Sequence, residues 1–284
     1  MINRLEDFGG SGQRIVLAHA NGYPPGCYRQ FIERLTPHFS VQGYRHRALW
    51  SSVSPAHTDT WHNFSDDLIT TLEATQFDPV WMMGHSMGGA ISVLAASKRP
   101  DLFKGLILVD PVFMGTRAVL AMYLTPRSML AKTPVVRKTL GRPDLWDTRQ
   151  EAFDFHRAKR PYQGFSDEAL WDFIHSGTGL TEGGKYGLAY SKHWEAHVYQ
   201  SVPWVWPKLY KIKLPVLGLR GEQTYVLSQK HWYRWGRIQP QARLIECPGG
   251  HLLPMEKPES TARAVLEYMV EQGVLGDKVL AETA

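Results

Sequence analysis

The chain alternates between short apolar runs and segments in which apolar residues recur every three or four positions. Short runs predict buried strands, and the three-to-four spacing predicts helices with one buried face. The runs lie at residues 15–18, 40–44, 80–83, 105–109, 215–219 and 242–247. Helical segments lie between them, most clearly at residues 28–35, 61–72, 88–98, 231–236 and 258–272. Strands that alternate with helices predict an α/β fold, with a mostly parallel sheet flanked by helices.

This alternation stops between residues 111 and 213. The segment is rich in Trp, Tyr and Phe, contains several prolines and has a helical pattern. An insertion that follows the carboxyl end of a strand in a parallel sheet lies over the place where such sheets bind ligands. We therefore predict a core domain of residues 1–110 and 214–284, covered by a helical cap of residues 111–213.

A serine lies at the centre of the sequence Gly84-His85-Ser86-Met87-Gly88, between a predicted strand and a helix of small residues. Glycines on both sides permit the sharp strand-to-helix turn that exposes a nucleophilic hydroxyl above a sheet. The helix N-terminus that follows favours negative charge. We predict that Ser86 is a nucleophile and that His85 has a packing role.

Two further loops follow predicted strands. In the first, HANG at residues 19–22, the main-chain N–H of Asn21 can point to the same place as that of Met87, and two such donors form an oxyanion hole. In the second, PGGH at residues 248–251, glycines allow the His251 imidazole to reach Ser86. We predict oxyanion donors at Asn21 and Met87 and a general base at His251, while His19 braces its loop.

The segments HANG, GHSMGG, LILVDP and CPGGHLLPMEKPE together resemble capped serine hydrolases of the α/β-hydrolase superfamily. The resemblance covers the chain outside the cap, and HANGYPP and RHRALW are similar to segments of a bacterial subgroup. Its family pattern places the catalytic acid after the strand at residues 215–219. This chain has GEQTY there, without an Asp. Relatives such as haloalkane dehalogenases place the acid where Asp110 stands, so we favour Asp110 and keep Glu222 as the alternative.

The resemblance implies hydrolysis of carboxylic esters or related acyl bonds through an acyl-enzyme, without a cofactor or metal. A carbon–carbon bond hydrolase or lyase on the same residues is an alternative, and so is a non-hydrolytic receptor or signalling protein. Aromatic residues in the predicted cap favour a small, mainly apolar substrate. Arg47 and Trp50, in a loop after the second strand, are candidates for substrate contact, although we favour a surface-packed loop.

The net charge of +5 does not indicate a nucleic-acid partner. Residues 111–213 contain 15 Lys and Arg against 9 Asp and Glu, and the rest of the chain contains 17 against 18. The basic excess is mixed with acids and forms no nucleic-acid motif.

The apolar segment 112–124 is followed by basic residues, so a membrane-attached lipase is a further alternative. Because burial in the cap explains the segment more simply, we expect no membrane contact. The first ten residues lack the apolar stretch of a signal peptide, and the two cysteines are far apart. We expect a cytoplasmic protein without disulfides.

Overall fold

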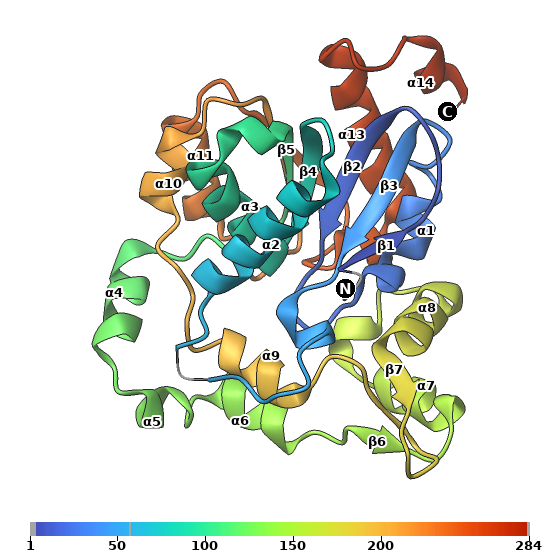
Figure 1. The fold of residues 1–284 in the computed structure, drawn as a ribbon, viewed down its shortest axis with the longest axis vertical. Helices are drawn as coiled ribbons and strands as arrows, with labels where there is room; N and C mark the ends of the chain where they lie inside the picture. Colours follow the sequence, from blue (N-terminus) through green and yellow to red (C-terminus); the bar gives the residue numbers. More distant parts are fainter. Residues whose placement is uncertain (1–3, 57, 283–284) are drawn as a thin grey trace.

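The computed structural model of the protein describes residues 4–56 and 58–282. Its centre is a seven-stranded sheet in the order β1-β3-β2-β4-β5-β9-β10 (Figure 1). The strands are β1 (Leu5–Asp7), β2 (Gln13–Ala18), β3 (Phe39–Tyr44), β4 (Val80–His85), β5 (Phe103–Val109), β9 (Val216–Gly221) and β10 (Arg243–Cys247). Only β1 runs antiparallel to its neighbour, and the sequence pattern did not predict this short strand. The predicted α/β fold class is confirmed.

Helices cover both faces of this sheet because successive strand residues point to opposite sides. Val16 and Ala18 pack with α2, α3 and α11, whereas Ile15 and Leu17 pack with α1 and α13. The helical elements of the core are η1 (Pro25–Tyr28), α1 (Arg29–Ile32), η2 (Arg47–Leu49), α2 (Trp61–Thr75), α3 (Met87–Lys98), η3 (Pro100–Leu102), α11 (Gln229–Ile238), α12 (Leu253–Glu256), α13 (Pro258–Glu271) and α14 (Lys278–Glu282). Two separate apolar cores thus hold the sheet rigid beneath the loops at its carboxyl end.

The glycines around Ser86 allow α3 to pack closely on the sheet. A Cβ atom on Gly88 would lie 2.0 Å from the carbonyl oxygen of Ala18, and one on Gly84 would lie 2.5 Å from the carbonyl oxygen of Gly88. Ser86 has φ 55°, a left-handed conformation that is strained for a residue with a side chain. The chain therefore turns sharply between β4 and α3, with the serine at the turn.

The segment between β5 and β9 is not purely helical, in contrast to the prediction. It also contains a small antiparallel sheet, in which Gly179 pairs with Gly187 on the adjacent strand. Its elements are α4 (Thr116–Leu124), α5 (Arg127–Leu130), α6 (Pro134–Gly141), β6 (Leu145–Trp146), α7 (Arg149–Arg157), η4 (Arg160–Tyr162), α8 (Asp167–Gly177), β7 (Thr178–Leu180), β8 (Tyr186–Leu188), α9 (Lys192–Val198) and α10 (Trp206–Lys211). Helix α8 contacts the core through Asp172, which binds Arg29 at 2.6 Å, and α10 packs on α3.

The expected burial of the apolar segment 112–124 is wrong for its helical part. In α4 only Val119 is buried, while the exposed fractions of Leu120, Tyr123 and Leu124 are 50%, 57% and 84%. Helices α4 and α5 lie along the outer edge of the molecule, and α6 continues along this edge, packed against α9 (Figure 1). Among the described residues, no helix is both long and apolar enough to cross a membrane.

Candidate active site

Three side chains from separate loops form one line of hydrogen bonds at the carboxyl end of the sheet. The Ser86 Oγ atom lies 2.9 Å from Nε2 of His251, and Nδ1 of His251 lies 2.5 Å from Oδ2 of Asp110. All three residues are buried, with Asp110 fully so and His251 9% exposed. A carboxylate that accepts from Nδ1 leaves Nε2 free to accept the serine proton, which is the arrangement that activates a serine.

The loop after β9 holds the Asp110 carboxylate, although it contributes no acid of its own. The main-chain N–H of Gly221 donates to Oδ1 at 3.3 Å, and the Thr224 hydroxyl donates to Oδ2 at 2.5 Å. Glu222, the alternative acid, is exposed, and its main-chain N–H donates to the carbonyl of Cys247. The structure therefore brings Asp110, and not Glu222, to His251. The sequence analysis missed Thr224, because its position beside Asp110 depends on the pairing of β5 with β9.

The two predicted oxyanion donors lie at the ends of neighbouring strands. Strand β2, which leads to Asn21, pairs with β4, which leads to Met87. Among the described residues, the main-chain N–H groups of Asn21 and Met87 donate to no protein acceptor. Met87 is the first residue of α3, so its N–H is one of the free donors at a helix start. Both groups are free to bind a developing oxyanion.

A buried histidine connects the oxyanion loop to the loop of His251. Ala20 N–H donates to the Tyr28 hydroxyl at 2.9 Å, and this hydroxyl lies 2.7 Å from Nδ1 of His85. His85 Nε2 lies 2.8 Å from the carbonyl oxygen of His251, so it carries the proton and donates. Burial, together with the nearby His251, lowers the pKa of His85 to about 3. His85 is thus a neutral positioning residue, and Tyr28 is a partner that the sequence did not reveal.

A second histidine pair braces the oxyanion loop from the other side. His46 donates through Nε2 to the carbonyl oxygen of His19 at 2.9 Å, and its main-chain N–H donates to Nε2 of His19 at 3.3 Å. His19 Nδ1 lies 2.7 Å from the carbonyl oxygen of Ala20. Burial lowers the pKa of both histidines, that of His46 to about 4. His19 is therefore neutral and has its ring nitrogens occupied within this loop.

A buried ion pair from the cap lies against the oxyanion loop. Arg142, just after α6, binds both carboxylate oxygens of Glu195 on α9. The carbonyl oxygen of Glu195 accepts from the Asn21 side chain at 3.1 Å, and a Cβ atom on Gly22 would lie 2.9 Å from its carboxylate. Burial raises the pKa of Glu195, and the Arg142 charge opposes that shift. We name Arg142 and Glu195 the cap clamp.

Arg47 and Trp50 do not contact these residues. The guanidinium of Arg47 binds Asp67 and Asp59, each at 2.7 Å, and Trp50 donates to the carbonyl oxygen of Arg45 at 3.1 Å. These contacts agree with the favoured packing role of the loop, because two carboxylates already pair with the Arg47 charge.

Tyr225 is a better candidate for substrate contact than either of these residues. Its ring centroid lies 5.8 Å from that of His251, and the residue is 80% exposed. It follows Thr224 in the loop after β9, so its exposed ring lies beside His251.

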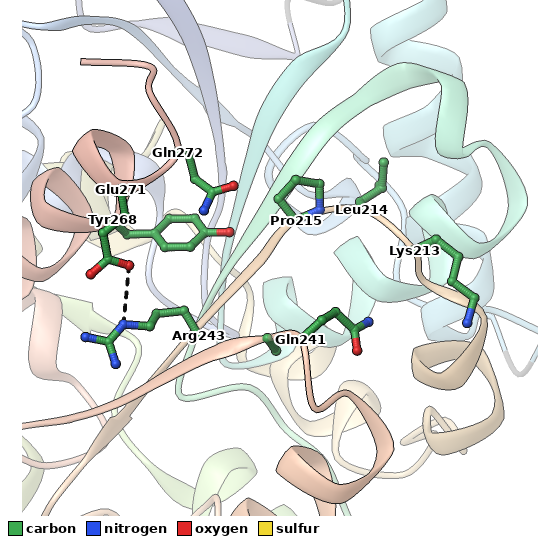
Figure 2. Close-up of a pocket in the computed structure, with 9 residues that line it drawn as sticks. Lys213, Leu214, Pro215, Gln241, Arg243, Tyr268, Glu271 and Gln272 are labelled. Atoms are coloured by element: carbon green, nitrogen blue, oxygen red, sulfur yellow. Dashed lines mark ion pairs between the residues drawn. The ribbon is translucent and has the colours of Figure 1, made fainter. Parts of the chain in front are cut away.

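A separate hollow of about 440 Å³ lies at the opposite end of the sheet, where β9 and β10 begin. Figure 2 shows Tyr268 and the ion pair of Arg243 with Glu271 at its wall, and the two charged atoms are 3.4 Å apart. This hollow is lined by residues at the start of the strands, whereas the serine follows a strand end. Among the described residues, no group of three or more His, Cys, Asp or Glu side chains is placed to hold a metal ion.

A parallel sheet of this order, with a serine at a strained strand-to-helix turn and a histidine after the last strand, defines the α/β-hydrolase class. The family model described as "alpha/beta hydrolase fold" matches residues 15–258. The chain belongs to the α/β-hydrolase family.

Individual relatives share this class. A monoglyceride lipase of Rattus norvegicus is 36% identical over 207 residues, which are 70% of this chain and 61% of the lipase. The match therefore spans less than two thirds of that relative. A 2-(acetamidomethylene)succinate hydrolase of Mesorhizobium japonicum is 23% identical over 92% of this chain and 89% of its own. The crystal structure of E-2-(acetamidomethylene)succinate hydrolase superposes with a TM-score of 0.78 at 22% identity, over 93% of this chain and 94% of that one.

Proposed function

We propose that the protein is a serine hydrolase that cleaves carboxylic esters through an acyl-enzyme intermediate. The observation that carries this proposal is the line of hydrogen bonds from Ser86 through His251 to Asp110. A monoglyceride is a carboxylic ester of glycerol, so the similarity to a monoglyceride lipase supports an ester substrate.

The reaction begins when His251 accepts the Ser86 proton at Nε2 and the serine oxygen attacks the ester carbonyl. The N–H groups of Asn21 and Met87 bind the oxyanion, and each such donor contributes about 2.7–4 kcal/mol to transition-state stabilisation. His251 then gives its proton to the leaving alcohol, and the acyl group remains on Ser86. Water attacks the acyl-enzyme with His251 again as base, which releases the acid and restores the serine.

Asp110 acts on His251 throughout this cycle. It holds Nδ1 of His251 in the protonated tautomer and stabilises the imidazolium that forms during attack. The donors to its carboxylate, Gly221 and Thr224, fix its orientation from the opposite side. The same groups would serve any acyl bond, and the aromatic residues in the segment between β5 and β9 favour small to medium apolar acyl groups.

Labelling with a fluorophosphonate, combined with hydrolysis of p-nitrophenyl esters of increasing chain length, tests the proposal. We expect labelling of the native chain, loss of labelling in Ser86→Ala, and a fall in kcat/KM of several orders of magnitude, roughly 10⁴ or more. Ser92→Ala is the matched control, because Ser92 is a buried serine of α3 whose hydroxyl binds the carbonyl of Gly88. Labelling that persists in Ser86→Ala would contradict the assignment.

The panel also separates the alternatives. Turnover of a diketone but not of esters would indicate a carbon–carbon bond hydrolase. Labelling of Ser86 without turnover of either substrate would favour a receptor or signalling role on the same fold.

A further inference from the structure

The first third of the predicted cap has an unusual charge composition. Residues 111–143 contain six Lys or Arg and no Asp or Glu. One of the six, Arg142, is bound to Glu195 in the cap clamp. The other five are Arg117, Arg127, Lys132, Arg137 and Lys138. Within residues 4–56 and 58–282, none of these five forms an ion pair, and all but Arg127 are exposed. The segment of α4, α5 and α6, which we name the arm, therefore carries uncompensated positive charge.

The same arm exposes apolar side chains that a soluble surface does not require. Leu120, Tyr123 and Leu124 in α4 have the i, i+3, i+4 spacing of one helix face, and Arg117 lies on that face one turn earlier. The exposed apolar side chains of the arm are Leu120, Tyr123, Leu124, Met129, Val135 and Leu140, with exposed fractions from 37% to 84%. Exposed apolar side chains that gather on one segment mark an interaction site.

Trp204 extends this surface beside the start of α4. Its ring is 42% exposed, and its Nε1 donates to the Thr116 hydroxyl at 3.2 Å. Tyr and Trp rings concentrate where a membrane meets water, since they have an apolar body and a polar edge. Apolar, aromatic and cationic groups thus occur together on one protruding edge of the molecule.

We propose that the arm docks on the surface of an anionic lipid membrane, with its apolar side chains inserted among the headgroups. Helices that lie in a membrane interface combine a Leu- and aromatic-rich face with Lys and Arg, and their binding adds apolar burial to attraction for anionic lipid. A second copy of the chain fits poorly, because a two-fold interface would place the same five positive charges against each other. The proposal goes beyond ester hydrolysis and does not depend on the chemistry of Ser86.

Co-sedimentation with vesicles tests this proposal on the full chain carrying Ser86→Ala, so that binding is measured without turnover. We expect binding to vesicles of equal parts phosphatidylglycerol and phosphatidylcholine, weaker binding to phosphatidylcholine alone, and a further loss as salt is added. The variant Leu120→Ser/Leu124→Ser should bind at least about tenfold more weakly, because two inserted side chains are lost. Lys132→Gln should bind about fivefold more weakly.

Two matched variants control for general surface effects. Leu180→Ser changes a leucine in β7 that is 68% exposed but lies outside the arm, and Lys104→Gln changes an exposed lysine near the start of β5. Both should bind as the parent does, and circular dichroism should show the same thermal midpoint for all variants. The proposal is overturned by equal binding to both kinds of vesicle, by equal loss in the control variants, or by no binding at all. A change from dimer to monomer in Leu120→Ser/Leu124→Ser, measured by sedimentation without vesicles, would assign the arm to an interface between copies instead.

Discussion

Asp110, at the carboxyl end of the sheet, and the arm are close in sequence, but their charged groups differ in burial and in hydrogen-bond partners. At the sheet end, Asp110 is fully buried, and each oxygen of its carboxylate accepts a hydrogen bond. In the arm, which begins only a few residues later, the positive charges have no carboxylate partners among the described residues, and Leu124 is 84% exposed. A buried charge must be satisfied by protein groups, whereas an exposed charge or apolar side chain can be left for a partner.

This difference predicts where substitutions act. At the sheet end, a change of one atom disturbs a line of buried contacts and lowers turnover or stability. In the arm, much larger changes leave the isolated protein intact and affect only what it binds. The following experiments test that contrast.

The largest effect is expected for Asp110→Asn, measured as kcat for a short p-nitrophenyl ester. An amide at this position favours the wrong tautomer of His251, and the corresponding change in a serine protease lowers kcat by about 10⁴. Fluorophosphonate labelling and the thermal midpoint report whether the protein remains folded. Glu222→Gln is the control and should retain native kcat, because Glu222 is exposed and does not contact His251. A large loss in Glu222→Gln with native kcat in Asp110→Asn would reverse the two roles.

The cap clamp should give the next largest effect. Glu195→Gln leaves the Arg142 guanidinium without its charge partner, and breaking a buried ion pair costs about 3–5 kcal/mol of unfolding free energy. Urea unfolding measures this loss, and kcat should also fall because the Glu195 main chain holds Asn21.

Two variants make this test specific. Glu182→Gln removes an exposed glutamate elsewhere in the cap and should be neutral. Arg142→Met/Glu195→Leu replaces the whole pair with apolar groups and should recover much of the lost stability. If the double variant is no more stable than Glu195→Gln, the stability lost in Glu195→Gln does not come from the unpaired charge of Arg142 alone.

Acid should destabilise the sheet end through its buried histidines. The folded-state pKa values of His46 and His85 are about 4 and 3, below the ordinary 6.5. Their stabilising contribution is therefore complete above about pH 6.5 and is lost as the pH falls toward those lower values, because the unfolded chain binds protons first. For His46 the full loss is about 3 kcal/mol.

The free energy of unfolding as a function of pH measures this effect. Because the pKa of Glu195 is raised, the contribution of this residue to stability falls as the pH rises above its ordinary value of about 4.5. This pH dependence is opposite in sign to that of the histidines. His46→Asn should therefore flatten the profile below about pH 6.5, whereas the exposed His193→Asn should not. The same steepness in both variants would exclude His46 as a source of the acid sensitivity.

The smallest effect is expected in the arm. Leu124→Ser should change the unfolding free energy by less than about 0.5 kcal/mol and leave turnover of a soluble ester unchanged. The matched change in the core, Leu108→Ala in β5, removes a fully buried side chain and should cost about 2–5 kcal/mol. A comparable loss of stability in Leu124→Ser would show that the arm packs against the molecule in solution.

The sequence alone determined most strands and helices of the core and the position of the serine, but not β1 or the small sheet of β6, β7 and β8. Alternating apolar runs and helical spacing are local signals, because side-chain direction repeats every two residues in a strand and every 3.6 in a helix. The glycines around Ser86 are also a local signal, since they permit the close approach of α3 to β2 and β4. The succession of strand, turn and helix around Ser86 therefore followed from a short stretch of chain.

Only the tertiary structure decided which carboxylate meets His251 and which apolar segment is buried. Asp110 and Thr224 are far apart in sequence, and the pairing of β5 with β9 brings their side chains together. Segment 112–124 has the composition of a buried helix, yet in α4 only Val119 is buried, because no other described element packs over the outer face of that helix. Local pattern fixes the direction in which a side chain points from its own helix or strand. Burial and partnership depend on what the rest of the chain places there.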